Sequence, residues 1–304
     1  MSNRFTGVLA PVITPFDDNL LPDRTRFVNH CRWLQAQGCG LAIFGTNSEA
    51  NSLSVAEKLA LLEAMEDSRV DCRSLMPGTG SCALPDSVTL TRAALAAGAG
   101  GVLMLPPFYY KGVSDDGLFA YYAEIIQQLA DDRLQIYLYH IPQVSGVPLP
   151  LSLIERLVKT YPQQIAGIKD SSGDWSNTLA MLEAGWEDFR VFCGSESFLL
   201  RTMQHGGAGC ISATANVNPA MIVRLFESWS AADAEQQQQR LDQIRQIFQD
   251  RPMIPALKGA LASYGKDPQW LRVRPPLVGL TAEQFAGLEQ AMQQAAFAMP
   301  GIGA

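Results

Sequence analysis

Charged residues and metal-binding residues are scarce in this sequence. Only 17% of the 304 residues are charged, and only three are histidines. These histidines do not combine with the six cysteines into a zinc-binding pattern, so no metal site is expected. The net charge is −7 and the isoelectric point is near 5.0. Nucleic acid binding is therefore not expected, since that function calls for a basic patch.

Paired cysteines, targeting segments and long apolar runs are also missing. There is no CxxC pair, and scattered thiols of this kind are typical of a reducing compartment. They stand at Cys31, Cys39, Cys72, Cys82, Cys193 and Cys210. The first five residues are not a basic stretch followed by an apolar run, and no apolar run is long enough to cross a bilayer. These features predict a cytoplasmic protein with no membrane partner.

Hydrophobic residues, in contrast, are plentiful. They make up 47% of the chain, and the mean hydropathy of +0.03 is that of a compact globular protein. The length is close to that of one α/β barrel with a small addition, although length alone would also allow two ordinary domains.

Short apolar runs alternate with stretches of helical periodicity as far as Trp229. Eight runs are candidate strands: Val8–Ile13, Leu41–Phe44, Ser74–Met76, Gly101–Leu105, Gln135–Tyr139, Ile165–Ile168, Arg190–Cys193 and Gly209–Ile211. The helical stretches that follow them are 23–37, 55–67, 86–97, 116–130, 151–160, 175–184, 197–205 and 219–229. Ser54 and Glu57 have the spacing of a capping box. Apolar strands separated by helices indicate a buried parallel sheet, and eight such units predict an α/β protein with a (β/α)8 TIM barrel.

An open, doubly wound sheet is the alternative fold. It would usually carry a GxGxxG turn after the first strand, and Val8–Ile13 instead leads into Thr14-Pro15-Phe16. After Trp229 the pattern changes to helices without strands, at 234–249, 255–264 and 281–293. We therefore predict a barrel over residues 1–230 and a helical C-terminal extension, packed on the barrel, over residues 231–304.

The active site of such a barrel is built from residues that follow its strands. Lys169 follows the apolar run Ile165-Ala166-Gly167-Ile168. Strict alternation places Ile165, Gly167 and Lys169 on one face, and if that face is inward the amine lies in the barrel mouth. Burial there favours the uncharged amine, which is a nucleophile for ketones. A lone lysine at this place is more often an exposed strand end, so the neighbouring motifs decide its role.

Two hydroxyl residues also follow predicted strands. Tyr139 ends the strand before Lys169, and a phenol near a lysine can move protons while a C–C bond breaks. Thr46 follows Gly45 in a turn, where its hydroxyl and the neighbouring N–H groups could hold a carboxylate. Taken singly, a core tyrosine and an ordinary turn are the more common explanations of these residues.

The order and spacing of seven motifs resemble the dihydrodipicolinate synthase and N-acetylneuraminate lyase superfamily, whose members are class I pyruvate-dependent aldolases. The motifs are Gly7–Phe16, Gly45-Thr46-Asn47-Ser48-Glu49, Gly78-Thr79-Gly80, Pro107–Lys111, Tyr139-His140-Ile141-Pro142, Gly167–Asp174 and Gly209–Val217. They span nearly the whole chain. Each is weak alone, and together they are specific for the superfamily but much less so for a substrate.

The resemblance implies a role for each matching residue. Lys169 matches the lysine that forms an imine with pyruvate or another 2-oxo acid, so no separate cofactor is expected. Tyr139 matches the tyrosine that relays protons, and Thr46 matches the hydroxyl residue that links this tyrosine to a second one. Tyr109 resembles that second tyrosine, which in the family comes from a neighbouring subunit. The implied assembly is a homotetramer, built as a dimer of dimers.

The departures from the family pattern bear on the substrate. Where the family turn usually reads Gly-Thr-Thr-Gly-Glu or Gly-Ser-Thr-Gly-Glu, this chain has Asn47 and Ser48. His140 stands where asparagine is common. Val144 stands where the lysine-pathway synthases carry an arginine for the carboxylate of aspartate semialdehyde, and valine cannot form that ion pair. An apolar residue there fits the sialic acid lyases, but segments 194–197 and 212–214 do not reproduce their sugar-binding residues.

These residues together predict a Schiff-base lyase or aldolase that interconverts a 4-hydroxy-2-oxo acid, such as a 2-keto-3-deoxy sugar acid, with pyruvate and an aldehyde. The predicted substrate-binding residues are Gly45, Asn47, Val144, Glu196 and Ile211. A dihydrodipicolinate synthase, and a dehydratase or hydratase-aldolase that uses the same imine, stay open as alternatives. From another class, a non-catalytic regulator that binds an oxo acid stays open, because the fold does not fix the function.

Overall fold

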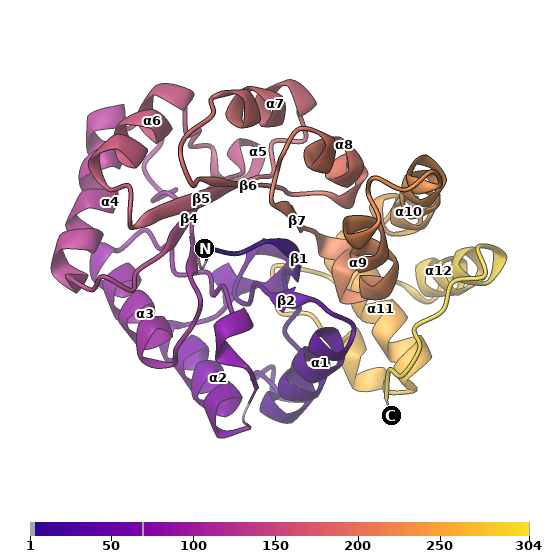
Figure 1. Cartoon of the computed structure of the whole chain (residues 1–304). Helices are drawn as coiled ribbons and strands as arrows, with labels where there is room; N and C mark the ends of the chain where they lie inside the picture. Colours follow the sequence, from indigo (N-terminus) through magenta and orange to yellow (C-terminus); the bar gives the residue numbers. More distant parts are fainter. Residues whose placement is uncertain (1–3, 69, 304) are drawn as a thin grey trace.

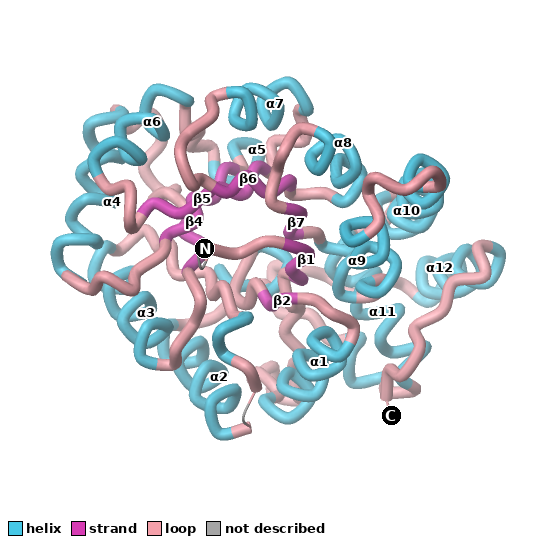
Figure 2. Tube along the Cα trace, viewed as in Figure 1, coloured by secondary structure: helices cyan, strands magenta, loops and turns pink. Residues whose placement is uncertain are grey.

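A parallel sheet curls around the centre of the molecule, and helices cover its outer face (Figures 1 and 2). The computed structural model describes residues 4–68 and 70–303. The strands are β1 (Gly7–Ala10), β2 (Gly40–Leu41), β3 (Val102–Met104), β4 (Ile136–His140), β5 (Ile165–Asp170), β6 (Arg190–Cys193) and β7 (Gly209–Ile211). They pair in the order β2-β1-β7-β6-β5-β4-β3, and every pairing is parallel.

Of the eight predicted strands, the one at Ser74–Met76 is not a strand in the structure, so that prediction is wrong. Residues Cys72–Ser74 form a 3-10 helix, after which Leu75 makes only an isolated bridge to Leu41 and Gly78 one to Leu103. Pro77 interrupts the pairing because it lacks the N–H group that a ladder needs. Hydrogen bonds from the segment 75–79 to both edges of the sheet, Met76 N to Leu41 O at 2.8 Å and Thr79 N to Leu103 O at 3.0 Å, nevertheless join β2 to β3.

The helices follow the predicted periodicity. The predicted bounds differ from the observed ones by two residues at most for α1 (Arg24–Ala36), α2 (Val55–Asp67), α3 (Leu84–Ala96), α4 (Asp115–Leu129), α6 (Leu151–Thr160), α7 (Trp175–Glu183), α8 (Leu199–Gln204) and α9 (Pro219–Glu227). The capping box is confirmed, because the Ser54 amide donates to Glu57 at 2.8 Å and the Glu57 amide donates to Ser54 at 3.2 Å. The four-residue helix α5 (Pro142–Ser145) was not predicted. Within residues 4–68 and 70–303, no helix combines the length and apolar character needed to span a membrane.

Strand residues alternate between an inner and an outer hydrophobic cluster. Tyr137, Tyr139 and Ile211 belong to the inner one, whereas Ile136 and Ile168 pack between the sheet and the helices. This arrangement makes the inside of the curled sheet a solid core with polar groups at its carboxyl end.

Strand β5 departs from strict alternation. Ile136 pairs with Ile165, but the next residue of β4, Tyr137, pairs with Gly167, so Ala166 is an extra residue on β5. Ile165 consequently packs in the outer cluster, and the prediction that it shares the face of Lys169 is wrong. Gly167 is required where the strands converge, because a Cβ there would lie 2.3 Å from Arg190 O.

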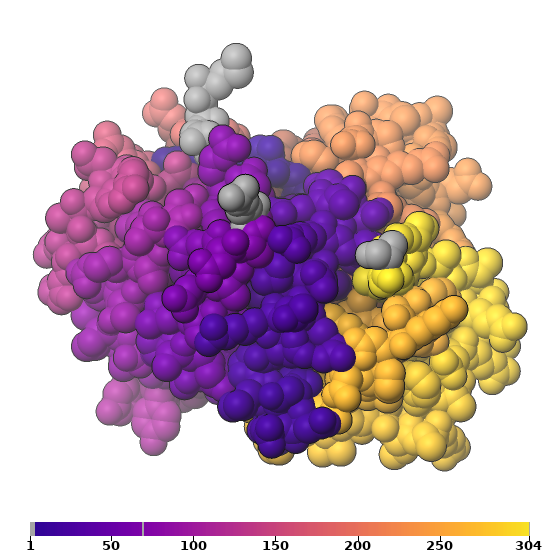
Figure 3. Space-filling model, turned by 90° about the horizontal axis from the view of Figure 1, so that it is seen from below, coloured from indigo at the N-terminus to yellow at the C-terminus, as the bar shows by residue number. Residues whose placement is uncertain are grey.

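The C-terminal extension consists of α10 (Ala234–Gln249), α11 (Met253–Gly265) and α12 (Ala282–Gln294). Figure 3 shows its orange and yellow residues against the indigo N-terminal residues. Leu257 and Leu261 of α11 are fully buried in one hydrophobic cluster with Phe27 and Leu34 of α1. The extension therefore packs against α1 through a shared core. The division at residue 230 stays a prediction.

Near this packing, His30 of α1 is held as a neutral imidazole. The amide of Ile13 donates to Asn216 Oδ1 at 3.0 Å, which identifies this atom as an acceptor. His30 Nε2, 3.2 Å from the same oxygen, must therefore carry a proton. His30 Nδ1 is buried without a partner in the described part of the chain. Burial lowers the pKa of His30 to about 4, and the bond to Asn216 opposes this only in part.

This lowered pKa predicts a loss of stability in mild acid. The unfolded chain binds a proton at this residue below about pH 6.5, whereas the folded chain binds one only near pH 4. The free energy of unfolding should therefore fall by about 3 kcal/mol as the pH drops through this window. Urea denaturation at pH 7 and pH 4.5 measures it, and His30→Gln should flatten the dependence. His205→Gln, at an exposed histidine, is the control and should keep the pH dependence of the free energy of unfolding. An equally steep pH dependence in His30→Gln would contradict its assignment to His30.

Candidate active site

Lys169 lies at the carboxyl end of β5 and is buried, with 2% of its surface exposed. The register of β4 and β5 pairs Tyr139 directly with Lys169. As a result, Lys169 Nζ lies 3.2 Å from the Tyr139 hydroxyl and 4.3 Å from the centroid of its ring. An amine so placed has an apolar environment and a single phenol as its hydrogen-bond partner in the described chain.

Thr46 extends this contact into a chain of three polar groups. Its Oγ1 lies 3.2 Å from the Tyr139 hydroxyl, so the phenol bridges Thr46 and Lys169. Thr46 begins a 3-10 helix, Thr46–Ser48, that follows β2. The structure thus brings together three of the four residues predicted to be catalytic, from three different loops and strands.

The turn that carries Thr46 is held from within. The Gly45 amide donates to Ser48 Oγ at 3.0 Å, and Thr14 Oγ1 donates to Ser48 O at 2.7 Å. The serine that departs from the family pattern therefore has a structural function in this turn. Across residues 4–68 and 70–303, the amides of Thr46 and Asn47 have no protein acceptor. These two donors, beside the Thr46 hydroxyl, suit a carboxylate group.

Glu196 is surrounded by protein donors. Its carboxylate accepts hydrogen bonds from Ser212, from Thr214 and, at 2.7 Å, from Arg245 of α10, and only 1% of the residue is exposed. Ser212 and Thr214 follow β7, whereas Glu196 follows β6. A direct role of Glu196 in substrate binding stays a prediction, and these contacts compete with it.

The other predicted residues occupy contrasting places. Ile211 is fully buried in the inner cluster that also contains Tyr139. Tyr109 and Val144 are 74% and 61% exposed. The Tyr109 ring packs against Tyr110, with centroids 5.3 Å apart. Within one chain, Tyr109 and Val144 therefore have free surfaces that a substrate or another subunit could cover.

The sequence analysis missed a second buried lysine near this cluster. Lys58 of α2 is 7% exposed and lines a narrow cavity together with Thr46 and Tyr139. Burial lowers its pKa, and the charge of Asp86 opposes this shift. No sequence signal separates Lys58 from an ordinary helical lysine, because only the fold turns this position inward.

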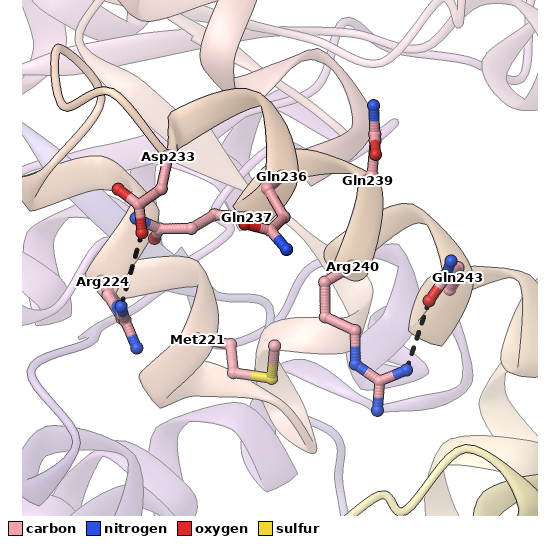
Figure 4. A pocket seen from close by; sticks show the side chains of 8 residues that line it. All are labelled: Met221, Arg224, Asp233, Gln236, Gln237, Gln239, Arg240 and Gln243. Carbon is pink, nitrogen blue, oxygen red and sulfur yellow. Dashed lines mark hydrogen bonds and ion pairs between the residues drawn. The ribbon is translucent and has the colours of Figure 1, made fainter.

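Nothing in the described chain resembles a metal centre. Residues 4–68 and 70–303 contain no group of three or more His, Cys, Asp or Glu side chains that could hold a metal. A hollow between α9 and α10, lined by polar residues such as Arg224, Asp233 and Arg240, is shown in Figure 4. It shares no residue with the cluster around Lys169, so we place the candidate active site at that cluster.

Comparison with known proteins identifies the family. The model of the dihydrodipicolinate synthetase family matches residues 4–295. The chain belongs to this family. Within the dihydrodipicolinate synthetase family, a 4-hydroxy-tetrahydrodipicolinate synthase of Thermus thermophilus is 34% identical over 92% of this chain and 92% of its own length.

Two further similarities within the dihydrodipicolinate synthetase family involve YagE of Escherichia coli K12. This protein, provisionally named a 2-dehydro-3-deoxy-D-gluconate aldolase, is 31% identical over 95% of this chain and 97% of its own length. The crystal structure of YagE in complex with pyruvate superposes with a TM-score of 0.87 at 28% identity, covering 96% of this chain and 99% of YagE. Members of the family thus include carbon–carbon lyases with different named substrates.

Proposed function

We propose that this protein is a Schiff-base aldolase that cleaves or forms a 4-hydroxy-2-oxo acid, with pyruvate as one product or substrate and an aldehyde as the other. The observation that carries the proposal is the chain of hydrogen bonds from Lys169 through Tyr139 to Thr46 inside an apolar core. Family membership and the pyruvate complex of YagE support pyruvate as the oxo acid. We also propose that the fold is a complete (β/α)8 barrel.

The Lys169 amine attacks the C2 carbonyl of the oxo acid and forms a carbinolamine. Loss of water then gives a protonated imine, and this cation withdraws electrons from the neighbouring C3–C4 bond. The attack needs the uncharged form of the amine. The Tyr139 hydroxyl, 3.2 Å from Nζ, is placed to move protons in the carbinolamine.

Cleavage requires a proton to leave the C4 hydroxyl. Tyr139, which has given its own proton to the water lost from the carbinolamine, takes this proton, the C3–C4 bond breaks, and an aldehyde departs while the electron pair forms an enamine. Protonation at C3 and hydrolysis of the imine release pyruvate and restore the Lys169 amine. The amides of Thr46 and Asn47 hold the oxo-acid carboxylate, and Thr46 Oγ1 keeps the phenol in position.

The aldehyde that condenses with pyruvate is best explained as one that has no carboxylate of its own, because a carboxylate would need a partner such as arginine. Val144 follows β4 and is 61% exposed, and an apolar side chain there offers no charge-assisted bond. This favours an enzyme for 2-keto-3-deoxy sugar acids over one that condenses pyruvate with aspartate semialdehyde. The second candidate, a 4-hydroxy-tetrahydrodipicolinate synthase, is favoured by the similarity to the Thermus enzyme.

The proposal includes a homotetramer in the cytoplasm. Tyr109 and Tyr110 are 74% and 73% exposed, which is unusual for two adjacent aromatic residues unless a partner covers them. A second copy of the chain would bury them, and Tyr109 would then extend the hydrogen-bond chain of a neighbouring subunit.

Borohydride trapping tests the proposed chemistry. The protein is incubated with pyruvate and borohydride, and intact mass and peptide maps are recorded. We expect one reduced adduct on Lys169, because the one hydrogen-bond partner of its amine within residues 4–68 and 70–303 is a phenol. The map must separate Lys169 from the buried lysines Lys58 and Lys258.

Each other outcome changes the conclusion. An adduct on Lys58 alone would move the nucleophile to α2 and contradict the proposal. No adduct in folded protein would make a regulator, or an enzyme for a different 2-oxo acid, the better explanation. With the adduct established, pyruvate release from 2-keto-3-deoxy sugar acids is compared with condensation of pyruvate and aspartate semialdehyde. Faster condensation would favour the synthase.

A further inference from the structure

Lys258 of α11 forms an ion pair with Glu49, and both side chains are fully buried. The ammonium also donates to Arg272 O at 2.7 Å and lies 4.5 Å from the centroid of the Phe16 ring. Burial lowers the pKa of Lys258 to about 8, against the opposing influence of Glu49. Glu49 is the last residue of the turn that begins at Gly45, so this pair connects the C-terminal extension to the candidate active site.

The extension holds the same segment at two more points. The Arg274 amide donates to the second carboxylate oxygen of Glu49 at 2.9 Å. The Arg274 guanidinium donates to Ser52 O at 2.6 Å and to Glu57 of α2 at 2.7 Å. Both oxygens of Glu49 and the end of its loop are thus bound by residues that follow α10 in the chain.

The backbone conformation of the turn explains why Lys258 and Arg274 must hold it. Glu49 has φ of 56° and ψ of 31°, in the left-handed region that non-glycine residues rarely adopt. A conformation of this kind persists only where the surroundings hold it. The Glu49 amide in turn donates to Thr46 O at 3.2 Å, so the geometry at Glu49 is transmitted to Thr46.

A buried ion pair adds little net stability, because desolvation of both charges offsets their attraction. Its value here is the single conformation that it imposes. We propose that Lys258 and Glu49 are positioning residues, through which the C-terminal extension sets the carboxylate-binding turn of the active site. The inference rests on the proposed function, because the turn's ligand is the carboxylate of the oxo acid.

The experiment compares the native protein with Lys258→Met and Glu49→Gln. If the turn is mispositioned by about 1 Å, the KM for pyruvate in the aldol direction should rise by roughly 10- to 100-fold. The kcat at saturating pyruvate should change much less, because Lys169 and Tyr139 are untouched. Glu49→Gln keeps the shape of the side chain and leaves no buried unpaired carboxylate, so it also tests the idea if Lys258→Met fails to fold.

Arg26→Met is the matched control. Arg26 of α1 pairs with Asp267 at 2.6 Å and so also joins α1 to the extension, but its side chain makes no hydrogen bond to the turn 45–49 in the described part of the chain. Its KM for pyruvate should stay within about twofold of the native value. Trapping with pyruvamide, which lacks the carboxylate, should be unaffected in all three variants.

Two results would overturn the inference. One is an unchanged KM in folded Glu49→Gln, and the other is an equal loss in Arg26→Met, which would indicate general support of the fold. Failure of the proposed function is recognised separately, because the native protein would then give no adduct on Lys169.

Discussion

Lys169→Ala protein is expected to lose turnover by a factor on the order of 10⁴ or more, because in the proposed mechanism the Lys169 amine forms the imine that precedes C–C cleavage. The substitution also removes the hydrogen bond from Lys169 Nζ to Tyr139, so folding must be checked by thermal unfolding. Pyruvate release from a 4-hydroxy-2-oxo acid, coupled to a dehydrogenase, measures the effect. Borohydride should then trap no pyruvate on the variant.

Lys159→Ala serves as the control for this variant. Lys159 is an exposed lysine of α6, paired with Glu155 at 2.5 Å, and its loss should leave turnover unchanged. A folded Lys169→Ala protein that keeps turnover within tenfold of the native rate would refute the Schiff-base assignment. Trapping on Lys58 in that variant would show which amine replaces it.

Tyr139→Phe protein should still form the imine but should cleave it roughly 10²- to 10⁴-fold more slowly, the usual contribution of a general acid–base residue. The phenyl ring keeps its place beside the lysine, whereas the hydroxyl that bridges Lys169 and Thr46 is lost. Single-turnover kinetics separate the two steps, since trapping reports the imine and aldehyde release reports cleavage.

Tyr137→Phe is the matched control, two residues earlier on β4. Its hydroxyl accepts a hydrogen bond at 2.8 Å from the amide of Phe5, a residue that precedes β1. Its removal should cost about 1 kcal/mol of stability and leave the cleavage rate unchanged. Equal loss of cleavage in both variants would show that any disturbance of the inner core slows the reaction, and would remove Tyr139 from the mechanism.

Much of the fold could be predicted because local sequence determines it. Helix α2 has a clear start signal in its capping box, helix α6 has clear apolar periodicity, and the observed bounds of both are the predicted ones. The predictions that fail are those for which contacts distant in sequence determine the local structure. Ser74–Met76 is as apolar as a strand, but Pro77 and the crossing between two sheet edges prevent regular pairing. The extra residue Ala166 appears only in the register of β5 against β4.

The candidate site divides in the same way. Lys169, Tyr139 and Thr46 could be predicted because each lies at or just after the carboxyl end of a strand, and the carboxyl ends of neighbouring parallel strands lie at one edge of the sheet. The partners of Glu49 could not be found, since Lys258 is 209 residues away and lies on a helix without unusual features. Likewise, Glu196 was predicted to bind substrate, and its contact with Arg245, 49 residues later in the chain, could not be predicted from the sequence.

The contact between Glu49 and Lys258 also has a consequence for biosynthesis. The turn that contains Thr46 leaves the ribosome 209 residues before the lysine that fixes it, so the barrel strands can pair while the turn is still unrestrained. A nascent or truncated chain that ends before α11 would contain Lys169, Tyr139 and Thr46 and still lack an ordered carboxylate site. Full affinity for the carboxylate of the oxo acid would therefore be expected only once α11 has been synthesised.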